Sequence, residues 1–600
     1  MKKRKIMILS LAMMMAVLSL PACVKNNPDD NTDKEKYYPP KDDTEIVDDS
    51  DAAGKEIVIS DMTLFSVNGD NGKDDDNEIM DLIAQKTGVR VKDINSTGQT
   101  DEYAAVQALL ESDELPDFVD IGDSMKELYE SGKLVAWDNY LEKYPNLKEM
   151  YTDEEWDKFR MEDGHIYWAD ISDQYYKEDT NTIHDGEAFW IQARVLEAYD
   201  YPEINTLDRY FEILEKYASE YPTLPDGTTV IPYTCYCDDW YYYSIENAPM
   251  FLDGYPNDYC CIVDFEDDKT NPQVVDYNTT PTAEKYFRKL NEEYNNGIID
   301  PEFASQTGED YIEKLSSGCV LGMCDQYWNF SYGIKESFSA SRTASDGSSF
   351  CFADLGCDYV PLGLTIDEGM EQQWHTYGGY TIDASSGIAV TTSCENPDLA
   401  FEFMSRLLDQ DIHDLRFWGV EGTDYLVNDN GMYYRTPEMR DNWNSDEYKA
   451  KHTCEYACLP QWLGMSRDGK NCMQPCEQPS EFLATLPKSV SDCLQAYGCG
   501  NYVDMIGSSK VYANELPWFS LSSWFESSRM DISEEGSVAW TKMNETKHEW
   551  LPKIIMSKNF DGDWKSYLNA YNACNPQRFF DDAQNEVDER VGKALDKMEG

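Results

Sequence analysis

The strongest constraint on the fold is an alternation of short apolar segments and amphipathic segments between residues 56 and 121. Strands are short apolar runs, whereas helices repeat apolar residues every three to four positions. An alternating strand–helix order predicts a parallel α/β sheet covered by helices. The expected elements are strands at 56–60, 89–91 and 118–121 and two helices between them. One helix has Ile79, Leu82 and Ile83 on one face and ends at Gly88, and the other has Tyr103, Val106, Leu109 and Leu110 at helical spacing and is broken by Pro116.

Later helices are predicted from their start signals. Thr206, Thr280 and Asn396 each precede a helical pattern, and a proline follows the last two of them directly. Tyr286, Phe287 and Tyr294 share one face of the helix that follows Thr280, so we expect them in the core. From about 440 to 530 periodicity is weak, which predicts loops and short helices.

The first 23 residues resemble a bacterial lipoprotein signal. Residues 2–5, KKRK, are positive, and the apolar segment 6–20 is too short to span a membrane. The segment ends in 20–23, LPAC, where Pro21 is an imperfect match. On this interpretation Cys23 carries lipid and the body lies on the extracytoplasmic face of the bacterial cell membrane. The alternative is a plain cleaved signal in which Cys23 is incidental.

Residues 24–54 are predicted to be a disordered acidic linker, since Asp, Lys, Asn and Pro leave too little apolar surface to fold. The whole chain has 50 Lys and Arg against 114 Asp and Glu, a formal net charge of −64. Nucleic acid is therefore excluded as a partner, because its binding relies on cationic neutralisation of phosphates.

Sixteen of the 17 cysteines lie beyond Cys23. Export favours disulfides, and we expect some disulfides together with free thiols, with no pairing assigned. Cys454, Cys458, Cys472 and Cys476 suggest zinc as an alternative, but their spacing is not the usual one and His452 is poorly placed. We expect no metal and no cofactor.

Several motifs occur in the order found in one known family. Each is weak alone, but the order and spacing over about 55–590 are specific. They are 86–89 (KTGV), 114–117 (ELPD), 134–145 (LVAWDNYLEKYP), 163–167 (DGHIY), 297–303 (GIIDPEF), 396–401 (NPDLAF), 416–422 (RFWGVEG), 433–435 (YYR) and 560–568 (FDGDWKSYL). The chain thereby resembles extracellular solute-binding protein family 1, the maltose-binding-like lipoproteins of ABC importers, in their long Gram-positive form.

The resemblance implies an α/β, two-lobed, type II periplasmic-binding-protein-like fold with discontinuous lobes joined by a hinge. Lobe 1 would hold 55–170 and 380–430, and lobe 2 would hold 175–375 and 435–600. The chain would cross near 168–170, 377–380 and 419–431, and Gly378 and Gly379 would give the middle crossing its freedom. The ligand would lie in the interlobe cleft.

One departure concerns calcium. Long members of the family carry an Asp-rich calcium loop shortly before the equivalent of Ile231. Here 222–229 reads PTLPDGTT and supplies one carboxylate where calcium needs several oxygens. The acidic run 70–76 also fails the EF-hand spacing.

Candidate ligand-binding residues are aromatic or acidic and follow predicted strands or flank a crossing. Aromatic rings cover the apolar faces of sugars, and clefts in α/β proteins collect loops after strands. Trp328 matches the stacking tryptophan of sugar-binding relatives, in a loop expected after the strand 319–323, and Asp123 follows the strand that contains Asp120. The candidates are Asp123, Trp240, Tyr241, Tyr327, Trp328, Trp374 and Tyr377.

The resemblance implies a monomeric, non-enzymatic binding protein that captures a small solute and delivers it to ABC permease subunits. The solute we expect is a neutral oligosaccharide. Two alternatives stay open. One is an extracellular glycan-processing enzyme, for which 114 acidic residues give no specific signal. The other is a surface adhesin, or a surface lipoprotein that presents its ligand to a sensor kinase.

Overall fold

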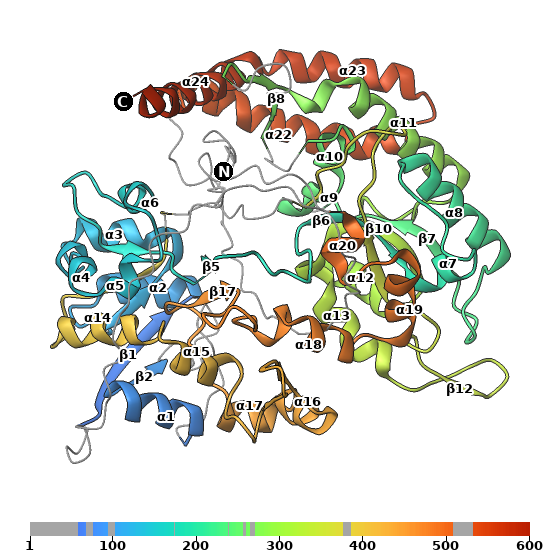
Figure 1. Ribbon diagram of the computed structural model, residues 1–600. Coiled ribbons are helices and arrows are strands. Elements are labelled where there is room, and N and C mark those ends of the chain that lie inside the picture. The colour runs from blue at the N-terminus through green and yellow to red at the C-terminus, as the bar shows by residue number, and fades with distance from the viewer. Residues whose placement is uncertain are drawn as a thin grey trace. The chain divides into compact units, whose positions relative to one another are not determined.

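The computed structural model describes residues 58–67, 76–93, 102–172, 174–237, 239–255, 260–264, 270–375, 384, 386–507 and 532–599 (Figure 1). Cys23, the linker 24–54 and the middle crossing with Tyr377 lie outside these residues. No helix among them combines the length and apolarity needed to cross a membrane.

The described chain forms two compact units, each discontinuous in sequence. The N-terminal unit lies within Cys23–Ser172 and Ser386–Gln461, and the C-terminal unit lies within Asp173–Ser385 and Trp462–Gly600. We expected the second lobe to resume at residue 435, but residues up to Gln461 pack in the N-terminal unit.

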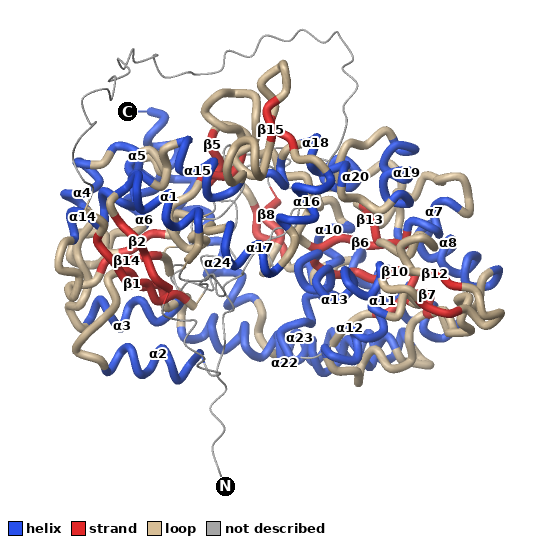
Figure 2. Tube along the Cα trace, turned by 90° about the horizontal axis from the view of Figure 1, so that it is seen from below, coloured by secondary structure: helices blue, strands red, loops and turns tan. Residues whose placement is uncertain are grey.

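The N-terminal unit is built on a five-stranded sheet in the order β2-β1-β3-β14-β4. β1 pairs in parallel with β2 and β3, and β14 pairs antiparallel with β3 and β4. Helices lie on both sides of this sheet (Figure 2). Its elements are β1 (Ser60–Ser66), α1 (Glu78–Thr87), β2 (Val89–Asp93), α2 (Glu102–Glu111), β3 (Phe118–Asp120), η2 (Gly122–Ser124), α3 (Met125–Glu130), α4 (Asp138–Lys143), α5 (Pro145–Lys148), α6 (Asp153–Lys158), β4 (Trp168–Ala169), β14 (Ile388–Val390), α14 (Pro397–Arg406), α15 (Gln410–Phe417), β15 (Leu426–Val427), β16 (Tyr433–Tyr434), α16 (Pro437–Trp443) and α17 (Asp446–His452).

The predicted alternation is confirmed, with one displaced strand. We expected a strand at 56–60, whereas β1 begins at Ser60. Val58 is 83% exposed, while Met62, Leu64 and Phe65 are buried. Successive residues of a strand face opposite sides of a sheet, and both sides of β1 are covered, so the stretch 62–65 with its buried Met62, Leu64 and Phe65 fits the position better.

A buried arginine holds the end of this unit together. The guanidinium of Arg416 on α15 donates to the carbonyl oxygens of Glu455 (2.8 Å), Tyr456 (3.2 Å) and Pro460 (2.5 Å). Its burial lowers the pKa of Arg416 to about 10, and the cation is satisfied by backbone dipoles. These bonds explain why 453–461 packs with the N-terminal sheet.

The C-terminal unit is built on a four-stranded sheet in the order β13-β6-β10-β7. β6 runs antiparallel to β10 and β13, and β10 runs parallel to β7. Every residue of β6, β10 and β13 is buried. Its elements are β5 (Gln174–Tyr176), β6 (Glu187–Gln192), α7 (Ala193–Glu197), α8 (Leu207–Glu220), β7 (Ile231–Thr234), η3 (Asp239–Tyr242), α9 (Tyr243–Glu246), α10 (Ala248–Leu252), β8 (Ile262–Asp264), β9 (Gln273–Val275), η4 (Tyr277–Thr279), α11 (Pro281–Asn296), α12 (Gly308–Ser316), β10 (Val320–Gln326), α13 (Tyr327–Ser339), β11 (Arg342–Thr343), β12 (Ser349–Phe350), β13 (Tyr359–Leu362), β17 (Trp462–Gly464), η5 (Pro475–Glu477), α18 (Pro479–Ala484), α19 (Lys488–Tyr497), α20 (Tyr502–Ile506), α22 (Glu534–Ile555), α23 (Phe560–Ala573) and α24 (Gln577–Glu599).

The predicted helix starts in this unit are confirmed. The Thr206 and Thr280 side chains accept hydrogen bonds from the backbone of the first turns of α8 and α11, and Gly297 ends α11 in the left-handed conformation. Tyr286 and Phe287 are buried as expected. The long helix α22 packs alongside both α23 and α24 in the C-terminal part of this unit (Figure 1).

Candidate functional site

The polar residues of the C-terminal unit concentrate where β10 ends and β6 begins. Gln326, the last residue of β10, pairs in register with Glu187, the first residue of β6. The chain turns directly from Gln326 into α13, so Trp328 lies in the first helical turn. The expectation of a loop after this strand is therefore wrong, although the expected position of Trp328 beyond the strand is correct.

Asp325 is buried and held by four donors. The hydroxyls of Tyr243 and Tyr311 donate to its two carboxylate oxygens at 2.8 and 2.7 Å. The Asn329 side-chain amide and the Gln326 backbone N–H add bonds of 3.0 and 2.8 Å. Burial raises the pKa of Asp325, and these hydrogen bonds partly oppose the rise. Asp325 thus anchors α9, α12 and α13 to the end of β10.

Glu187 is the centre of a second buried cluster. The side-chain amide of Asn247 donates to Glu187 Oε1 at 2.9 Å, and the Gln326 side chain also hydrogen-bonds the carboxyl. Tyr277 donates its hydroxyl to Asn247 Oδ1 at 3.1 Å. Burial raises the pKa of Glu187 to about 8, and the nearby Asp325 adds to the rise. Glu187 is therefore mostly protonated at neutral pH.

Trp328 is the half-buried end of this cluster. Its indole Nε1–H donates to Gln326 Oε1 at 2.5 Å. The neighbouring Tyr327 packs inward, with its ring centroid 5.4 Å from that of Trp190 and 5.6 Å from that of Phe330. Burial raises the pKa of the Tyr327 phenol. Tyr327 and Trp328 are both half-buried, so both stay candidates for contact with a solute.

The described side chains of the four-aromatic run at 240–243 are half-buried or buried. Trp240 and Tyr241 belong to η3, and nothing further is described for the Trp240 side chain. Tyr241 is half-buried, with its ring centroid 4.6 Å from that of Tyr236. Tyr243 is buried against Asp325. The run therefore supplies an anchor for the sheet end as well as the candidate Tyr241.

Trp374 is a core residue. It is 3% exposed, its ring stacks on Phe251 with centroids 4.2 Å apart, and its Nε1–H donates to the Leu364 carbonyl oxygen at 2.7 Å. The prediction that Trp374 faces a ligand is wrong, because its ring is buried against Phe251 and Phe189 and its polar atom is already bonded inside the unit.

Asp123 belongs to the N-terminal unit, where it lies in η2 directly after β3. Its side chain is outside the described residues. The related Asp120 is buried, and its Oδ1 accepts the backbone N–H of Gly122 at 3.1 Å. The structure therefore groups Trp240, Tyr241, Tyr327 and Trp328 in the C-terminal unit, with Asp123 in the other unit.

A buried histidine pair adjoins Glu187. His184 Nδ1 lies 2.9 Å from His375 Nδ1, and His184 Nε2 lies 2.9 Å from the Glu187 carbonyl oxygen. Burial lowers the pKa values of His184 and His375 to about 3 and about 4. Both rings are therefore neutral, and His375 donates its Nδ1–H to His184. The two residues are 191 positions apart, and no sequence pattern links them.

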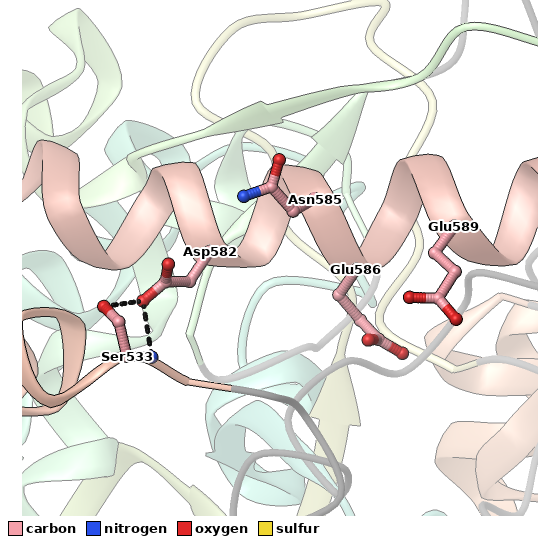
Figure 3. A pocket seen from close by; sticks show the side chains of 5 residues that line it. All are labelled: Ser533, Asp582, Asn585, Glu586 and Glu589. Carbon is pink, nitrogen blue, oxygen red and sulfur yellow. Dashed lines mark hydrogen bonds between the residues drawn. The ribbon is translucent and has the colours of Figure 1, made fainter.

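A separate acidic pocket of about 290 Å³ opens on α24 (Figure 3). Asp582 Oδ2 accepts hydrogen bonds from the backbone and hydroxyl of Ser533, and Glu586 pairs with Arg590 at 2.6 Å. No aromatic ring lines the pocket, so it lacks the stacking surface that a sugar site needs. Its lining residues are Ser533, Asp582, Asn585, Glu586 and Glu589.

None of the sixteen cysteines in the described part of the chain forms a disulfide, and thirteen of them are buried. The expected disulfides are therefore wrong.

Among the described residues, no group of three or more His, Cys, Asp or Glu side chains is arranged to hold a metal ion. The segment at 222–229 closes as a tight turn, in which Leu224 N–H donates to the Thr228 carbonyl oxygen and Thr228 N–H donates to Asp226.

The fold is that of the substrate-binding proteins of ABC transporters, of the type II periplasmic class. An HMO-binding ABC-transporter-associated solute-binding protein from Bifidobacterium longum infantis matches with a TM-score of 0.58 and 12% identity, over 88% of this chain and 99% of that chain. FusA from Streptococcus pneumoniae, solved in complex with kestose, matches with a TM-score of 0.56 and 15% identity, over 89% of this chain and 100% of that chain.

A further extracellular solute-binding protein from Bifidobacterium longum subsp. infantis matches with a TM-score of 0.56 and 14% identity, over 89% of this chain and 99% of that chain. No family model matches the sequence, and no curated protein is similar to it. At these identities the likeness establishes the fold, and the ligand has to be argued from this chain's own residues.

Proposed function

We propose that this protein is a non-enzymatic, monomeric solute-binding component of an ABC importer and that its ligand is a neutral oligosaccharide. The observation that carries the proposal is the half-buried indole of Trp328, hydrogen-bonded to Gln326 at the end of a buried strand. An aromatic ring held in this way offers a flat apolar face to a sugar ring. Tyr241 is the second candidate for such a contact.

The carboxyl groups near Trp328 are engaged within the protein, so the net charge of the chain is what disfavours an anionic ligand. Glu187 and Asp325 are both buried there, and each is held by hydrogen bonds rather than exposed as a free charge. Burial also raises the pKa of Asp185 to about 6. An anionic sugar would be opposed by the net charge of −64, whereas a neutral sugar avoids this electrostatic cost.

The structural neighbours support the same class of ligand. One of them was solved with kestose, and another binds HMO. We extend this to the present chain as a proposal, which is supported by the half-buried Trp328 next to the end of β10 in the C-terminal unit. Within family 1, the long lipoprotein type is the form we propose.

We further propose that Cys23 carries a lipid that holds the body on the extracytoplasmic face of the cell membrane. The support is the basic start, the short apolar segment and the small residue before Cys23. Transfer of the bound solute to permease subunits completes the proposed role.

The test is a screen of the mature body against neutral and acidic oligosaccharides by thermal shift, beginning with kestose. A ligand that binds only the folded state raises the melting temperature by mass action. Saturable binding with the sugar recovered intact supports the proposal. Release of shorter sugars would instead indicate a glycan-processing enzyme, and no shift with any sugar would favour a ligand-independent surface role.

A further inference from the structure

We propose that Gln326 is a positioning residue for Trp328. Its side-chain amide is held on Glu187 and fixes the orientation of the indole through the Nε1–H. The effect on sugar affinity rests on the proposed function, whereas the orientation of the ring can be measured without any ligand.

The pairing of two strands creates this arrangement. Gln326 and Glu187 are directly opposite each other in the antiparallel pair of β10 and β6. Residues opposite each other in such a pair project from the same face of the sheet, with Cβ atoms about 5 Å apart. The Gln326 side chain therefore reaches the Glu187 carboxyl, with which it forms a hydrogen bond.

The cluster under Trp328 is polar, buried and connected. Gln326, Glu187, Asn247 and Tyr277 are 4%, 2%, 2% and 1% exposed. Tyr277 donates to Asn247 at 3.1 Å, and Asn247 donates to Glu187 at 2.9 Å. Buried polar chains of this kind are rigid when their members are satisfied, because any rotation would leave a buried group unpaired.

The amide oxygen of Gln326 is then left to face the indole. With its NH₂ group directed to Glu187, Gln326 presents Oε1 to Trp328 Nε1 at 2.5 Å. The χ2 angle of tryptophan has broad wells that differ by a ring flip. A single N–H bond to a fixed acceptor selects one of these orientations and so decides which ring face is presented to a sugar.

The ligand-free test uses 5-fluorotryptophan labelling and fluorine NMR. The resonance missing in Trp328→Phe identifies Trp328 among the 15 tryptophans. In Gln326→Leu we expect this resonance to shift and to broaden or split as the ring gains a second orientation. If Gln326→Leu does not fold, Gln326→Met is measured in its place. A resonance unchanged in position and width would overturn the proposal.

The binding test is a double-mutant cycle measured by calorimetry with kestose, or with the neutral sugar of largest thermal shift. Gln326→Leu and Trp328→Phe should each weaken binding about threefold to tenfold, the size of one lost hydrogen bond. The double variant should lose no more than either single variant, because both remove the same bond. Fully additive losses would mean that Gln326 acts independently of Trp328.

Gln192→Leu is the matched control. Gln192, the last residue of β6, also carries a buried side-chain amide, but its Nε2 donates to the Gly318 carbonyl oxygen. This variant should lower stability while leaving the Trp328 resonance in place. Failure of the proposed function can be distinguished from failure of this proposal. If Trp328 does not contact the sugar, Trp328→Ala binds sugar as tightly as wild type, while the Trp328 resonance still shifts in Gln326→Leu.

Discussion

Trp328 and Trp374 occupy different environments within the C-terminal unit. Trp328 is half-buried in the first turn of α13 and bonds Gln326, whereas Trp374 is 3% exposed and stacks on Phe251. Both were site candidates on the basis of sequence. Removal of each ring therefore has a different expected consequence, one on binding and the other on stability.

Trp328→Ala should weaken oligosaccharide binding by about 1–3 kcal/mol and leave the melting temperature nearly unchanged, because the lost contact is with the sugar. Trp374→Ala should cost about 3–5 kcal/mol of unfolding free energy, because it leaves a cavity in the core. Calorimetry and thermal melting measure the two effects. A Trp328→Ala variant that melts much earlier but binds normally would place this ring in the core instead.

At the residue level, the sequence predicts positions along the chain better than partners in space. Trp328 was expected beyond a buried strand, and it lies there. Its support was not predicted, since Glu187 and Gln326 are 139 positions apart and meet only through the pairing of β6 with β10. Trp374 was misjudged because proximity to an expected crossing says nothing about which way a ring faces.

At the element level, predictions succeeded where the signal is local. Gly88 ends α1 and Thr280 caps α11, because both effects depend on one residue and the adjoining turn. β1 was displaced, since Val58 and Ile59 are apolar but exposed in the structure. The disulfides failed for a related reason: export suggests them, whereas pairing depends on which thiols the fold brings together.

The contact between α9 and α22 contains a buried ion pair. Lys547 Nζ lies 3.2 Å from Glu246 Oε2, with side-chain exposures of 3% and 15%. Tyr242 stacks on His548, with ring centroids 3.8 Å apart. Glu246→Gln should cost about 3–5 kcal/mol of unfolding free energy, because it leaves the Lys547 charge buried without its partner. Chemical denaturation measures this loss.

The same pair predicts an acid dependence of stability. Burial alone would raise the pKa of Glu246, but Lys547 and His548 outweigh it and lower this pKa to about 2. The unfolded chain binds the proton more tightly, so the contribution is present above about pH 4.5 and is lost as pH falls from there toward 2. Glu246→Gln should remove this part of the acid dependence.

Asp492→Asn provides the control for Glu246→Gln. Asp492 pairs with Lys488 on α19, and the two side chains are 42% and 85% exposed. An exposed pair of this kind contributes at most about 1 kcal/mol. Equal losses of unfolding free energy from the two variants would contradict the view that the buried Glu246–Lys547 ion pair stabilises the contact between α9 and α22.

At the scale of the whole molecule, the proposed anchor predicts where the protein is found. Cys23→Ala should leave the chain unlipidated, so that it is released from the membrane fraction or remains uncleaved, because no thiol is left to accept the lipid. Fractionation and mass spectrometry of the N-terminus check this. Cys574→Ala is the control, because it removes a thiol at the C-terminal end of α23. It should leave fractionation unchanged. A Cys23→Ala protein that is processed and membrane-bound like wild type would refute the anchor.

Titration calorimetry of the mature body with neutral oligosaccharides, followed by chromatography of the recovered sugar, tests the central claim most directly. We predict saturable binding of a neutral sugar, a weaker response to its acidic counterpart, weaker binding in Trp328→Ala, and recovery of the sugar intact. Preference for an acidic sugar, or recovery of cleaved products, would contradict it.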